Sequence, residues 1–399
     1  MPHCRASSIC TTHSPLASCS PLRRAEVRPL LAPAPSLTHR PDPQEETRTD
    51  VVLRPSAVAM AFLGEGHPHE TIAVPGVALA ADDVLVAVEL STICGSDVHT
   101  VHGRRSAPVP LVLGHESVGR VIALGESGAD AEDGTPLRIG DRVVWSVTVS
   151  CGTCDRCAAG MTQKCRELGK YGHERVAPHR ELTGAFASHV QLRRGTTIVR
   201  VPEALPATAL APASCATATA YAAVRRGAAG RDLDGVRVRV YGAGLVGLSA
   251  VAIAAAEGAV VDVVDPNAAR RRLATRFGAE PDASSADPEI AIEASGHAVA
   301  SAISDVAVGG TVVLIGSVFP ADPVPLDAES MVRRMITVTG VHNYTGAELA
   351  DAVAFLAGRG RAFPFAEMVG TVHPLADLDQ AIALAAAPDA APRIGVVAR

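Results

Sequence analysis

The chain lacks the features that mark membrane-spanning and nucleic-acid-binding proteins. No stretch of its 399 residues approaches the run of about eighteen apolar residues that a membrane-spanning helix requires. An excess of basic residues is also absent, because the formal net charge is −6. This balance gives no general attraction to nucleic acid or to an anionic membrane surface. We therefore expect a soluble protein with neither kind of partner.

Lysine is nearly absent, and cysteine is scarce and clustered. The only lysines are Lys164 and Lys170, whereas arginine and alanine are abundant. We interpret this imbalance as the codon usage of a GC-rich genome rather than as a functional signal. Nine cysteines are too few and too clustered for a disulfide scaffold in a chain of this length. Their C-x-x-C spacing indicates metal ligation in a reducing compartment, which we take to be the cytoplasm.

The first part of the chain has the composition of a disordered segment. Residues 1–55 are rich in Pro, Ser, Ala, Arg and Thr, without apolar periodicity, so they cannot bury enough surface to fold. They lack the compact apolar region of a secretory signal, and their prolines oppose the amphipathic helix of an organellar one. We expect a disordered extension, with the fold beginning near Ser56. The remaining length predicts two or three domains.

From Ser56 to about Val201 the sequence is typical of a β-rich domain. Alternating apolar runs over 84–88, 117–124 and 142–145 predict strands, and they are separated by Gly, Pro and Asp. Short strands of this kind, joined by tight turns, favour a partly open barrel.

A group of metal-ligating residue types lies within this β-rich region. Cys94-Gly-Ser96-Asp-Val-His99 is followed, past a basic loop, by Gly-His115-Glu116. These segments offer a thiolate, an imidazole and carboxylates for Zn²⁺, beside a serine and a second histidine that can pass a proton. A lone cysteine and a lone histidine at this separation are more often not metal ligands but a buried thiol and a histidine with ordinary hydrogen bonds. The remaining motifs decide between the two readings.

A second cluster has the spacing of a structural metal site. Its members, separated by two, two and seven residues, are Cys151, Cys154, Cys157 and Cys165. C-x-x-C turns aim successive sulfurs at one point, and four thiolates in a tetrahedron mark structural zinc. The first three cysteines also match the start of an iron–sulfur run, but the usual fourth spacing and the following proline are missing. We predict zinc.

A glycine-rich turn indicates a dinucleotide site. It follows an alternating run over 236–241, leads into an apolar helical segment, and is followed by a second strand that ends at Asp265. This succession is the setting of a dinucleotide-binding Rossmann unit, in which the helix N-terminus faces the pyrophosphate. The predicted cofactor contacts within the turn are Gly242, Gly244, Leu245, Val246 and Gly247.

The acid at the end of that second strand bears on the choice of cofactor. Asp265 would accept hydrogen bonds from the adenosine ribose and repel a 2′-phosphate, which favours NAD over NADP. Arg270, Arg271 and Arg272 lie just downstream and would reach a phosphate, but they also fit the solvated face of a helix beginning at Asn267.

Alternation of strands and helices continues to the end of the chain. Strands are predicted over 289–293, 311–315 and 336–339, as in a doubly wound parallel sheet. The piece between Phe277 and Glu289 is too short for a crossover helix, so we expect a loop or single turn there. A helix over 347–356 and a last strand over 393–397 form a tail.

Together these motifs resemble the zinc-dependent medium-chain alcohol dehydrogenases. The resemblance covers 56–399 and includes Cys215 with Thr219. It implies an α/β architecture of two folded domains and a returning tail. The parts are a GroES-like β-rich catalytic domain over 56–214 with a zinc lobe at 151–165, a Rossmann NAD-binding domain over 215–341, and a C-terminal return to the catalytic domain over 342–399.

The resemblance also implies roles for individual residues. The implied ligands of a catalytic zinc are Cys94, His115 and Cys215, which makes two zinc ions per chain with the structural one. Ser96 and His99 would relay the proton of the alcohol, and Thr219 would support the nicotinamide. Glu116 would be either a carboxylate beside the metal or an exchanging fourth ligand.

The expected activity is oxidation of a small-molecule alcohol with NAD, or less favoured NADP, by a homodimer or homotetramer. Runs at 99–105, 170–174, 316–320 and 340–344 are most similar to a subgroup proposed to act in phosphonate catabolism, with polyol and cyclitol dehydrogenases as near relatives. The substrate is therefore expected to be a polyol, a cyclitol or a phosphonate-bearing alcohol.

Two interpretations stay open at this point. Arg104 and Arg105, between the two ligand segments, would clamp an anionic group of the substrate, or they form a solvated surface pair. A non-catalytic zinc-binding or NAD-sensing protein would also explain the four-cysteine lobe. A zinc module for nucleic acid explains neither the glycine turn nor the negative charge.

Overall fold

The computed structural model describes residues 48–281 and 286–398, which belong to one compact unit, Glu46–Arg399. Most of the predicted extension, with Cys4, Cys10 and Cys19, lies outside the described residues. Among the helices that are described, none combines the length and apolar character needed to cross a membrane.

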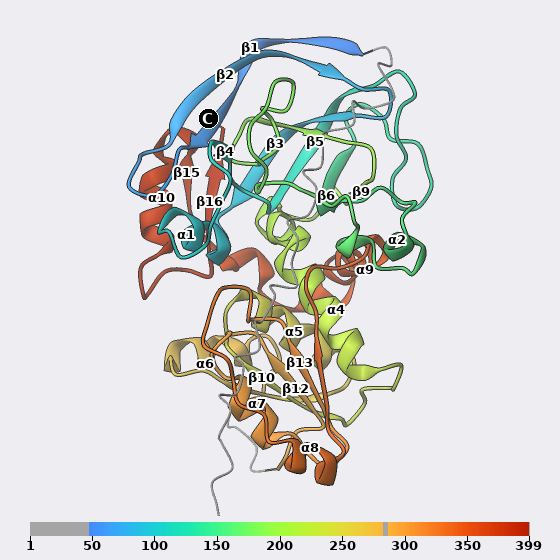
Figure 1. Cartoon of the computed structure of the whole chain (residues 1–399), viewed down its shortest axis with the longest axis vertical. Coiled ribbons are helices and arrows are strands. Elements are labelled where there is room, and N and C mark those ends of the chain that lie inside the picture. The colour runs from blue at the N-terminus through green and yellow to red at the C-terminus, as the bar shows by residue number, and fades with distance from the viewer. Residues whose placement is uncertain (1–47, 282–285, 399) are drawn as a thin grey trace, which may run out of the picture. The chain divides into compact units, whose positions relative to one another are not determined.

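Two sheets build the β-rich part of the protein (Figure 1). The larger has the order β15-β16-β3-β5-β6-β7, with β8 paired to β3 and β9 paired to β6, and the smaller has the order β2-β1-β4. Their strands are β1 Thr49–Phe62, β2 Glu70–Leu79, β3 Val84–Thr92, β4 Leu111–Val112, β5 Ser117–Leu124, β6 Arg142–Val149, β7 Gly169–Lys170, β8 His189–Leu192, β9 Thr196–Arg200, β15 Val369–Pro374 and β16 Arg393–Val397.

Strand β1 begins earlier than the sequence predicts. It starts at Thr49 and pairs with β2 from Thr49↔Leu79 onward, so the expected start near Ser56 is too late. The register shifts between Val52 and Ala57, which breaks the alternation that would have revealed one continuous strand.

A parallel sheet forms the second part. Its order is β11-β10-β12-β13-β14, and every neighbouring pair is parallel. The strands are β10 Arg237–Tyr241, β11 Val260–Val264, β12 Ile290–Glu293, β13 Thr311–Leu314 and β14 Thr337–Gly340. The strand order reverses between β10 and β12, which is the place where such sheets bind ligands. The predicted α/β class, with a curled β-rich sheet and a doubly wound parallel sheet, is confirmed.

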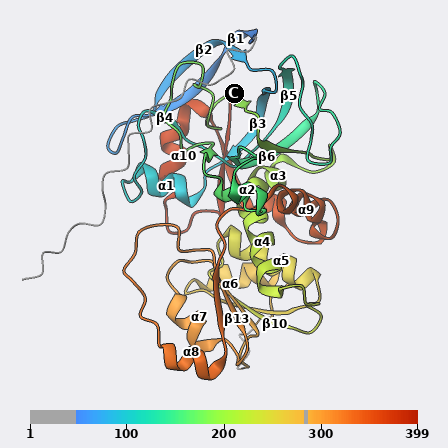
Figure 2. The same ribbon diagram turned by 45° about the vertical axis from the view of Figure 1, so that its right-hand side comes forward.

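Helices cover both faces of the parallel sheet (Figure 2). Val238 and Val240 of β10 pack in the same cluster as α4 and α5, whereas Tyr241 packs on the other face with Ala302 of α7. The helices are α1 Gly95–Val101, α2 Asp155–Ala158, α3 Ala207–Leu210, α4 Ala216–Ala228, α5 Leu245–Ala256, α6 Ala268–Thr275, α7 Val299–Asp305, α8 Ala328–Arg334, α9 Gly346–Ala357 and α10 Leu378–Ala385.

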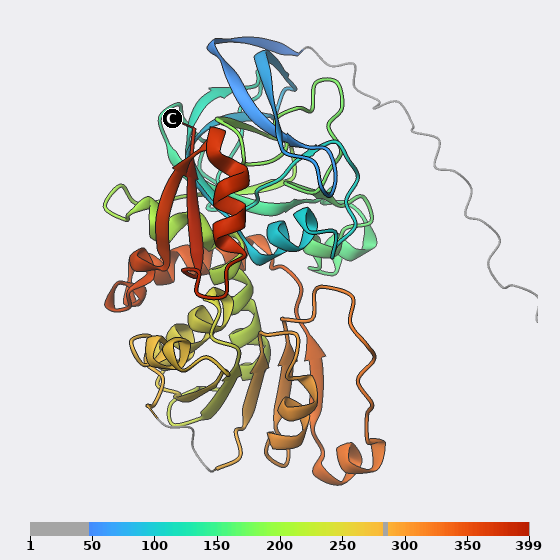
Figure 3. The ribbon, with the colours of Figure 1, turned by 90° about the vertical axis from the view of Figure 1, so that its left-hand side faces the viewer.

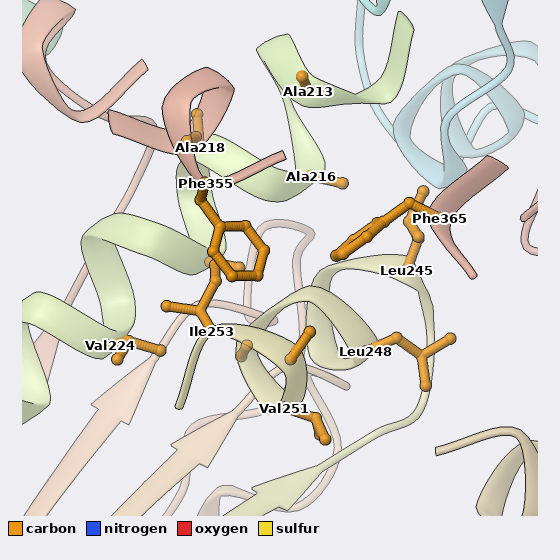
Figure 4. Packing of buried hydrophobic residues seen from close by; sticks show 14 of the residues in the cluster. Ala213, Ala216, Ala218, Val224, Leu245, Leu248, Val251, Ile253, Phe355 and Phe365 are labelled. Carbon is orange, nitrogen blue, oxygen red and sulfur yellow. The ribbon is translucent and has the colours of Figure 1, made fainter. Parts of the chain in front are cut away.

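The largest hydrophobic cluster joins the two parts. Leu248 and Ile253 of α5 lie in it with Val224 of α4, Phe355 of α9 and Phe365 (Figure 4). The same cluster includes residues of β5 and β6, so one continuous apolar core extends from the parallel sheet into the β-rich sheet. Burying this much apolar surface disfavours independent motion of the two parts.

The end of the chain returns to the β-rich part (Figure 3). Strand β16 pairs antiparallel with β3, at Gly395↔Thr92 and Val396↔Ser91, and α10 packs beside α1. Between α6 and β12, the described residues 276–281 and 286–289 contain no helix or strand, as expected for the short connection after Phe277.

Tyr344 is a buried polar link between the two parts. It lies just after β14, and its hydroxyl donates a hydrogen bond to the carbonyl of Ser214, ahead of α4. The same oxygen accepts the backbone N–H of Val147 in β6 at 3.2 Å. Burial raises the pKa of this phenol, so it stays neutral and serves as both donor and acceptor.

Replacing Tyr344 with Phe should therefore destabilise the protein. The change leaves the Val147 N–H and the Ser214 carbonyl without their partner, and each buried unpaired group costs about 1–3 kcal/mol. We expect the free energy of unfolding to fall by about 2 kcal/mol in urea titrations followed by Trp145 fluorescence. Tyr221→Phe is the control, because the Tyr221 hydroxyl has no hydrogen-bond partner among the described residues. Equal losses in both variants would contradict this account.

Candidate active site and metal centres

Four potential metal ligands from three separate segments converge on one point. Cys94 precedes α1, His115 and Glu116 precede β5, and Cys215 precedes α4. One ligand atom from each of the four residues lies within 4.8 Å of all the others. The sequence-predicted set of Cys94, His115 and Cys215 is thus brought together with Glu116, although its role as a zinc site stays a prediction.

The chemistry of this donor set fits a cation. A hydrogen bond from the Cys215 thiol lowers the pKa of Cys94 well below its usual value, and the same contact raises the pKa of Cys215. Burial raises both, so two thiols this close compete for one negative charge. A divalent ion would hold both sulfurs as thiolates, and two sulfurs with one imidazole suit Zn²⁺.

Asp97 positions both ligand-bearing segments. Its carboxylate accepts the backbone N–H of Cys94 at 2.9 Å and that of Gly114 at 3.4 Å. It also lies 3.4 Å from Nδ1 of His115. An acid at Nδ1 leaves Nε2 of the ring for a metal, the usual arrangement of a metal-ligating histidine. From the sequence Asp97 is only one of the carboxylates that could hold a metal. Its contact with His115 is not predicted, because that residue is distant in the chain.

His115 sits among opposing electrostatic influences. Burial lowers the pKa of its imidazole, but the Asp97 carboxylate and the Cys94 sulfur more than offset this and raise it to about 10. The ring is therefore cationic without a metal. Its Nε2 lies 3.2 Å from Oγ of Ser96, and the ring of His173 lies against it at a centroid distance of 5.1 Å.

A buried ion pair closes the other side of the cluster. Arg393 of β16 donates to both oxygens of Glu116, at 2.6 and 2.7 Å, and Thr92 donates to the same carboxylate at 2.6 Å. The guanidinium also lies 3.8 Å from the Cys94 sulfur. Burial raises the pKa of Glu116 and Arg393 opposes that rise. Sequence reasoning assigned Arg393 only to a terminal strand, and no local signal marks it.

The predicted proton relay lies on α1. Ser96 and His99 are three residues apart on this helix, which places them on the same face. The His99 ring stacks on Phe319, which follows β13, at 5.1 Å. Its Nδ1 is buried without a hydrogen-bond partner among the described residues. Burial, followed by the charge of Arg104, lowers the pKa of His99.

The four-cysteine lobe is compact enough to hold one ion. The sulfur of Cys154 lies 3.5 Å from that of Cys157 and 3.9 Å from that of Cys165, which is itself 3.4 Å from Cys151. A disulfide would need about 2.05 Å, whereas zinc–sulfur bonds of about 2.3 Å in a tetrahedron give sulfur separations near 3.8 Å. The four thiols of a cubane iron–sulfur cluster bind different irons and lie farther apart. The Cys4 cluster fits structural zinc.

Backbone groups favour the charged form of this lobe. Hydrogen bonds from the backbone and side chain of Thr153 lower the pKa of Cys151 to about 6. The Cys151 N–H donates to the Cys165 sulfur at 3.2 Å, and the Cys154 N–H donates to the Cys151 sulfur at 3.4 Å. Burial, by contrast, raises the pKa of Cys157 to about 12. Thiolate is the metal-binding form, so a cation would be needed to hold all four sulfurs as thiolates.

The glycine turn has the geometry of a pyrophosphate cradle. Gly242 has a φ of +96°, which favours glycine, and a Cβ on Gly247 would lie 1.9 Å from the Gly242 carbonyl oxygen, so helix and strand pack closely. A Cβ on Gly244 would meet nothing within 4 Å, which leaves room beside the N-terminus of α5. Leu245 is buried and Val246 is half-buried in the first turn of that helix.

The remaining predicted site residues lie at three places. Asp265 follows β11, and its carboxylate accepts the Ala243 N–H of the glycine turn at 2.7 Å. Thr219 lies one turn beyond Cys215 on α4. Arg105 is half-buried and lines a cavity of about 120 Å³ together with His173, whereas Arg104 is exposed.

Comparison with known proteins matches both parts of the chain. Residues 80–203 match the alcohol dehydrogenase GroES-like domain, and residues 246–358 match the zinc-binding dehydrogenase domain. The structure is similar to that of an alcohol dehydrogenase from Thermotoga maritima, with a TM-score of 0.78 and 26% identity over 86% of this chain and 99% of the other.

Two relatives are similar in sequence. A 5-exo-hydroxycamphor dehydrogenase from Pseudomonas putida is 34% identical over 57% of this chain, and the match spans 62% of that protein's length. An L-threonine 3-dehydrogenase from Anaeromyxobacter sp. strain K is 32% identical over 67% of this chain and 78% of its own length.

Metal content distinguishes the two clusters. Mass spectrometry of the purified protein should give close to two zinc ions per chain, one for each donor set. Cys154→Ser should lose one zinc and keep the other, and Cys94→Ser should do the same at the other site, so each variant is the control for the other. Iron in place of zinc, or unchanged zinc in both variants, would contradict the assignment.

Proposed function

Because the chain belongs to the zinc-dependent medium-chain alcohol dehydrogenase family, we propose that it oxidises an alcohol to a carbonyl compound with NAD. The observation that carries the proposal is the convergence of donor atoms from Cys94, His115, Glu116 and Cys215 within 4.8 Å. The first, second and fourth of these would hold the zinc, with Glu116 beside it or exchanging into the fourth position.

The chemistry would be divided between the bound groups and the chain. Zinc would polarise the alcohol oxygen and lower the pKa of the hydroxyl, and NAD would accept the hydride from the neighbouring carbon. Ser96, whose Oγ lies beside the ring of His115, would accept the hydroxyl proton while it passes its own proton toward His99. His99 would take that proton onward, because its lowered pKa keeps the ring neutral and its Nδ1 has no partner among the described residues.

The protein's own contribution is largely positioning. Asp97 orients His115 and tethers the backbone at Cys94. Arg393 holds Glu116 by two hydrogen bonds. Fixed donors of this kind reduce the reorganisation that the reaction would otherwise require.

NAD is proposed over NADP. The Asp265 carboxylate lies at the end of β11, where it would meet the adenosine ribose, and Thr219 on α4 would support the nicotinamide. Arg270, Arg271 and Arg272 are exposed on α6, and the Arg271 guanidinium donates to the Asp265 carbonyl. These contacts fit a solvated helix face better than a 2′-phosphate site.

The proposed substrates are a polyol, a cyclitol or a phosphonate-bearing alcohol, turned over by a homodimer or homotetramer. A cytoplasmic location is proposed as well, supported by the described cysteines, none of which forms a disulfide.

Activity is tested with zinc-loaded protein by NADH formation over a panel of 2-hydroxyethylphosphonate, cyclitols, sugar polyols and simple alcohols. We expect turnover on one class, and a loss of at least about 10³-fold in kcat for Cys94→Ser, because the Lewis acid is removed. Cys94→Ser should leave the lobe zinc in place, which separates loss of chemistry from loss of the fold. NAD binding without turnover on any alcohol would favour the non-catalytic, NAD-sensing alternative.

Replacing Asp265 with Ser tests the cofactor assignment. The change removes the charge that would repel a 2′-phosphate and the acceptors for the ribose hydroxyls. We expect the ratio of kcat/KM for NAD to that for NADP to fall by about tenfold or more, the value of one charge-assisted hydrogen bond. An unchanged ratio would refute the role of this residue.

A further inference from the structure

The only two lysines of the chain lie near each other and near the candidate active site. Lys164 ends the 3₁₀ helix η1, Thr162–Lys164, and its ammonium donates a hydrogen bond to Nδ1 of His342, which follows β14. Lys170 lies in β7, opposite Thr148 of β6.

The segment that follows Lys170 packs beside the metal ligands. A Cβ on Gly172 would lie 2.6 Å from the Gly114 carbonyl, so this segment packs directly against the residue before His115. The next residue, His173, lies against the His115 ring and lines the same cavity as Arg105. Of the three cationic side chains, Arg105 lines this cavity, and Lys170 lies two residues before Gly172 of its lining. Lys164 contacts His342, and the charges of Arg105 and Lys164 both act on Lys170.

These cations have no carboxylate partner in the described part of the chain, and the negative groups that act on Lys170 are the sulfurs of Cys215 and Cys94. Residues 48–281 and 286–398 provide no ion pair for Arg105, Lys164 or Lys170. The nearest acid in sequence, Glu174, is already engaged by Arg193 at 2.8 Å and by the backbone N–H of Lys170 at 2.6 Å. Like charges gathered without a partner are unfavourable unless an anion binds among them.

The side chains of this group also change one another's pKa values. Burial, and then the charge of Arg105, lowers the pKa of Lys170 to about 8, while the sulfurs of Cys215 and Cys94 oppose this. Desolvation and the charges of the two lysines lower the pKa of His342 to about 4, although the residue as a whole is exposed. His342 is therefore neutral, and because its Nδ1 accepts from Lys164, its Nε2 carries the proton and can donate.

We propose that Arg105, Lys164, Lys170 and His342 form a binding site for a phosphonate or phosphate-ester group of the alcohol substrate. The proposal rests on the proposed dehydrogenase function, since the cluster lies beside that site. Three unpaired cations and one neutral N–H donor match a group with up to two negative charges and three acceptor oxygens. A carboxylate offers one charge and two oxygens and would leave part of the cluster uncompensated.

The binding test uses the zinc-loaded full chain, Lys170→Gln and Lys164→Gln, and Arg226→Gln as a control on the exposed face of α4. Methylphosphonate, methyl phosphate and acetate are titrated into each by calorimetry. Both phosphorus anions should bind, and their dissociation constants should rise about tenfold in the lysine variants, as for loss of a charge-assisted hydrogen bond. The anion that binds more tightly shows whether the substrate carries a phosphonate or a phosphate ester.

Two results would contradict the proposed anion site. Unchanged binding of both phosphorus anions in the two lysine variants would overturn the site, as would acetate binding as tightly as either of them. Two variants are used because Lys164 and Lys170 lie in different elements, so a folding defect in one leaves the other informative. The Arg226 variant should match the unaltered protein in every titration.

Turnover separates this proposal from the dehydrogenase function. Lys170→Gln should lower kcat/KM for 2-hydroxyethylphosphonate about tenfold and leave that for 1-propanol within about twofold. If neutral alcohols are oxidised and no anion binds, the dehydrogenase function stands and the anion site is overturned. If no alcohol is oxidised but anion binding still depends on the lysines, the site stands and the dehydrogenase function fails.

Discussion

The buried ion pair between Glu116 and Arg393 determines how the candidate active site is assembled. The two residues are 277 positions apart, and their side chains are 0% and 8% exposed. Removing one member of such a pair leaves an uncompensated buried charge, at a cost of about 3–5 kcal/mol. Thr92, at the end of β3, donates to the same carboxylate. The pair therefore joins the last strand to the segments that carry Cys94 and His115.

A second carboxylate, that of Asp97, also holds the ligand segments together. Asp97 accepts backbone hydrogen bonds from Cys94 and Gly114, residues that belong to separate ligand segments. Together with the ion pair it fixes the two segments before any metal is bound. The donor atoms then need little rearrangement to hold an ion, which is the physical basis of a preorganised site.

Sequence reasoning succeeds where the chemistry is local. The spacing of the four lobe cysteines and the glycines of the turn determine geometry over a few residues, so the Cys4 cluster and the parallel-sheet turn are readable from the sequence. Strands with clear alternation, such as β5, are located to the residue. The roles assigned to individual site residues stay predictions.

The features that the sequence does not reveal depend on distant partners. Arg393 is an ordinary strand arginine until β16 pairs with β3 and places it on Glu116. The start of β1 at Thr49 is hidden because a register shift interrupts its pattern. Lys164 belongs to no recognisable motif, because its contact with His342 forms only when the residues after β14 lie beside the four-cysteine lobe.

The position of Lys164 gives the four-cysteine lobe a consequence beyond stability. Lys164 directly precedes Cys165, and the Arg156 guanidinium donates to the Lys164 carbonyl at 3.1 Å. Closure of the four sulfurs around one ion would fix this backbone, and with it the ammonium that contacts His342. An ion in the lobe would thus hold Lys164 in place beside His342, so that the lobe would contribute to the proposed anion site as well as to the stability of the fold.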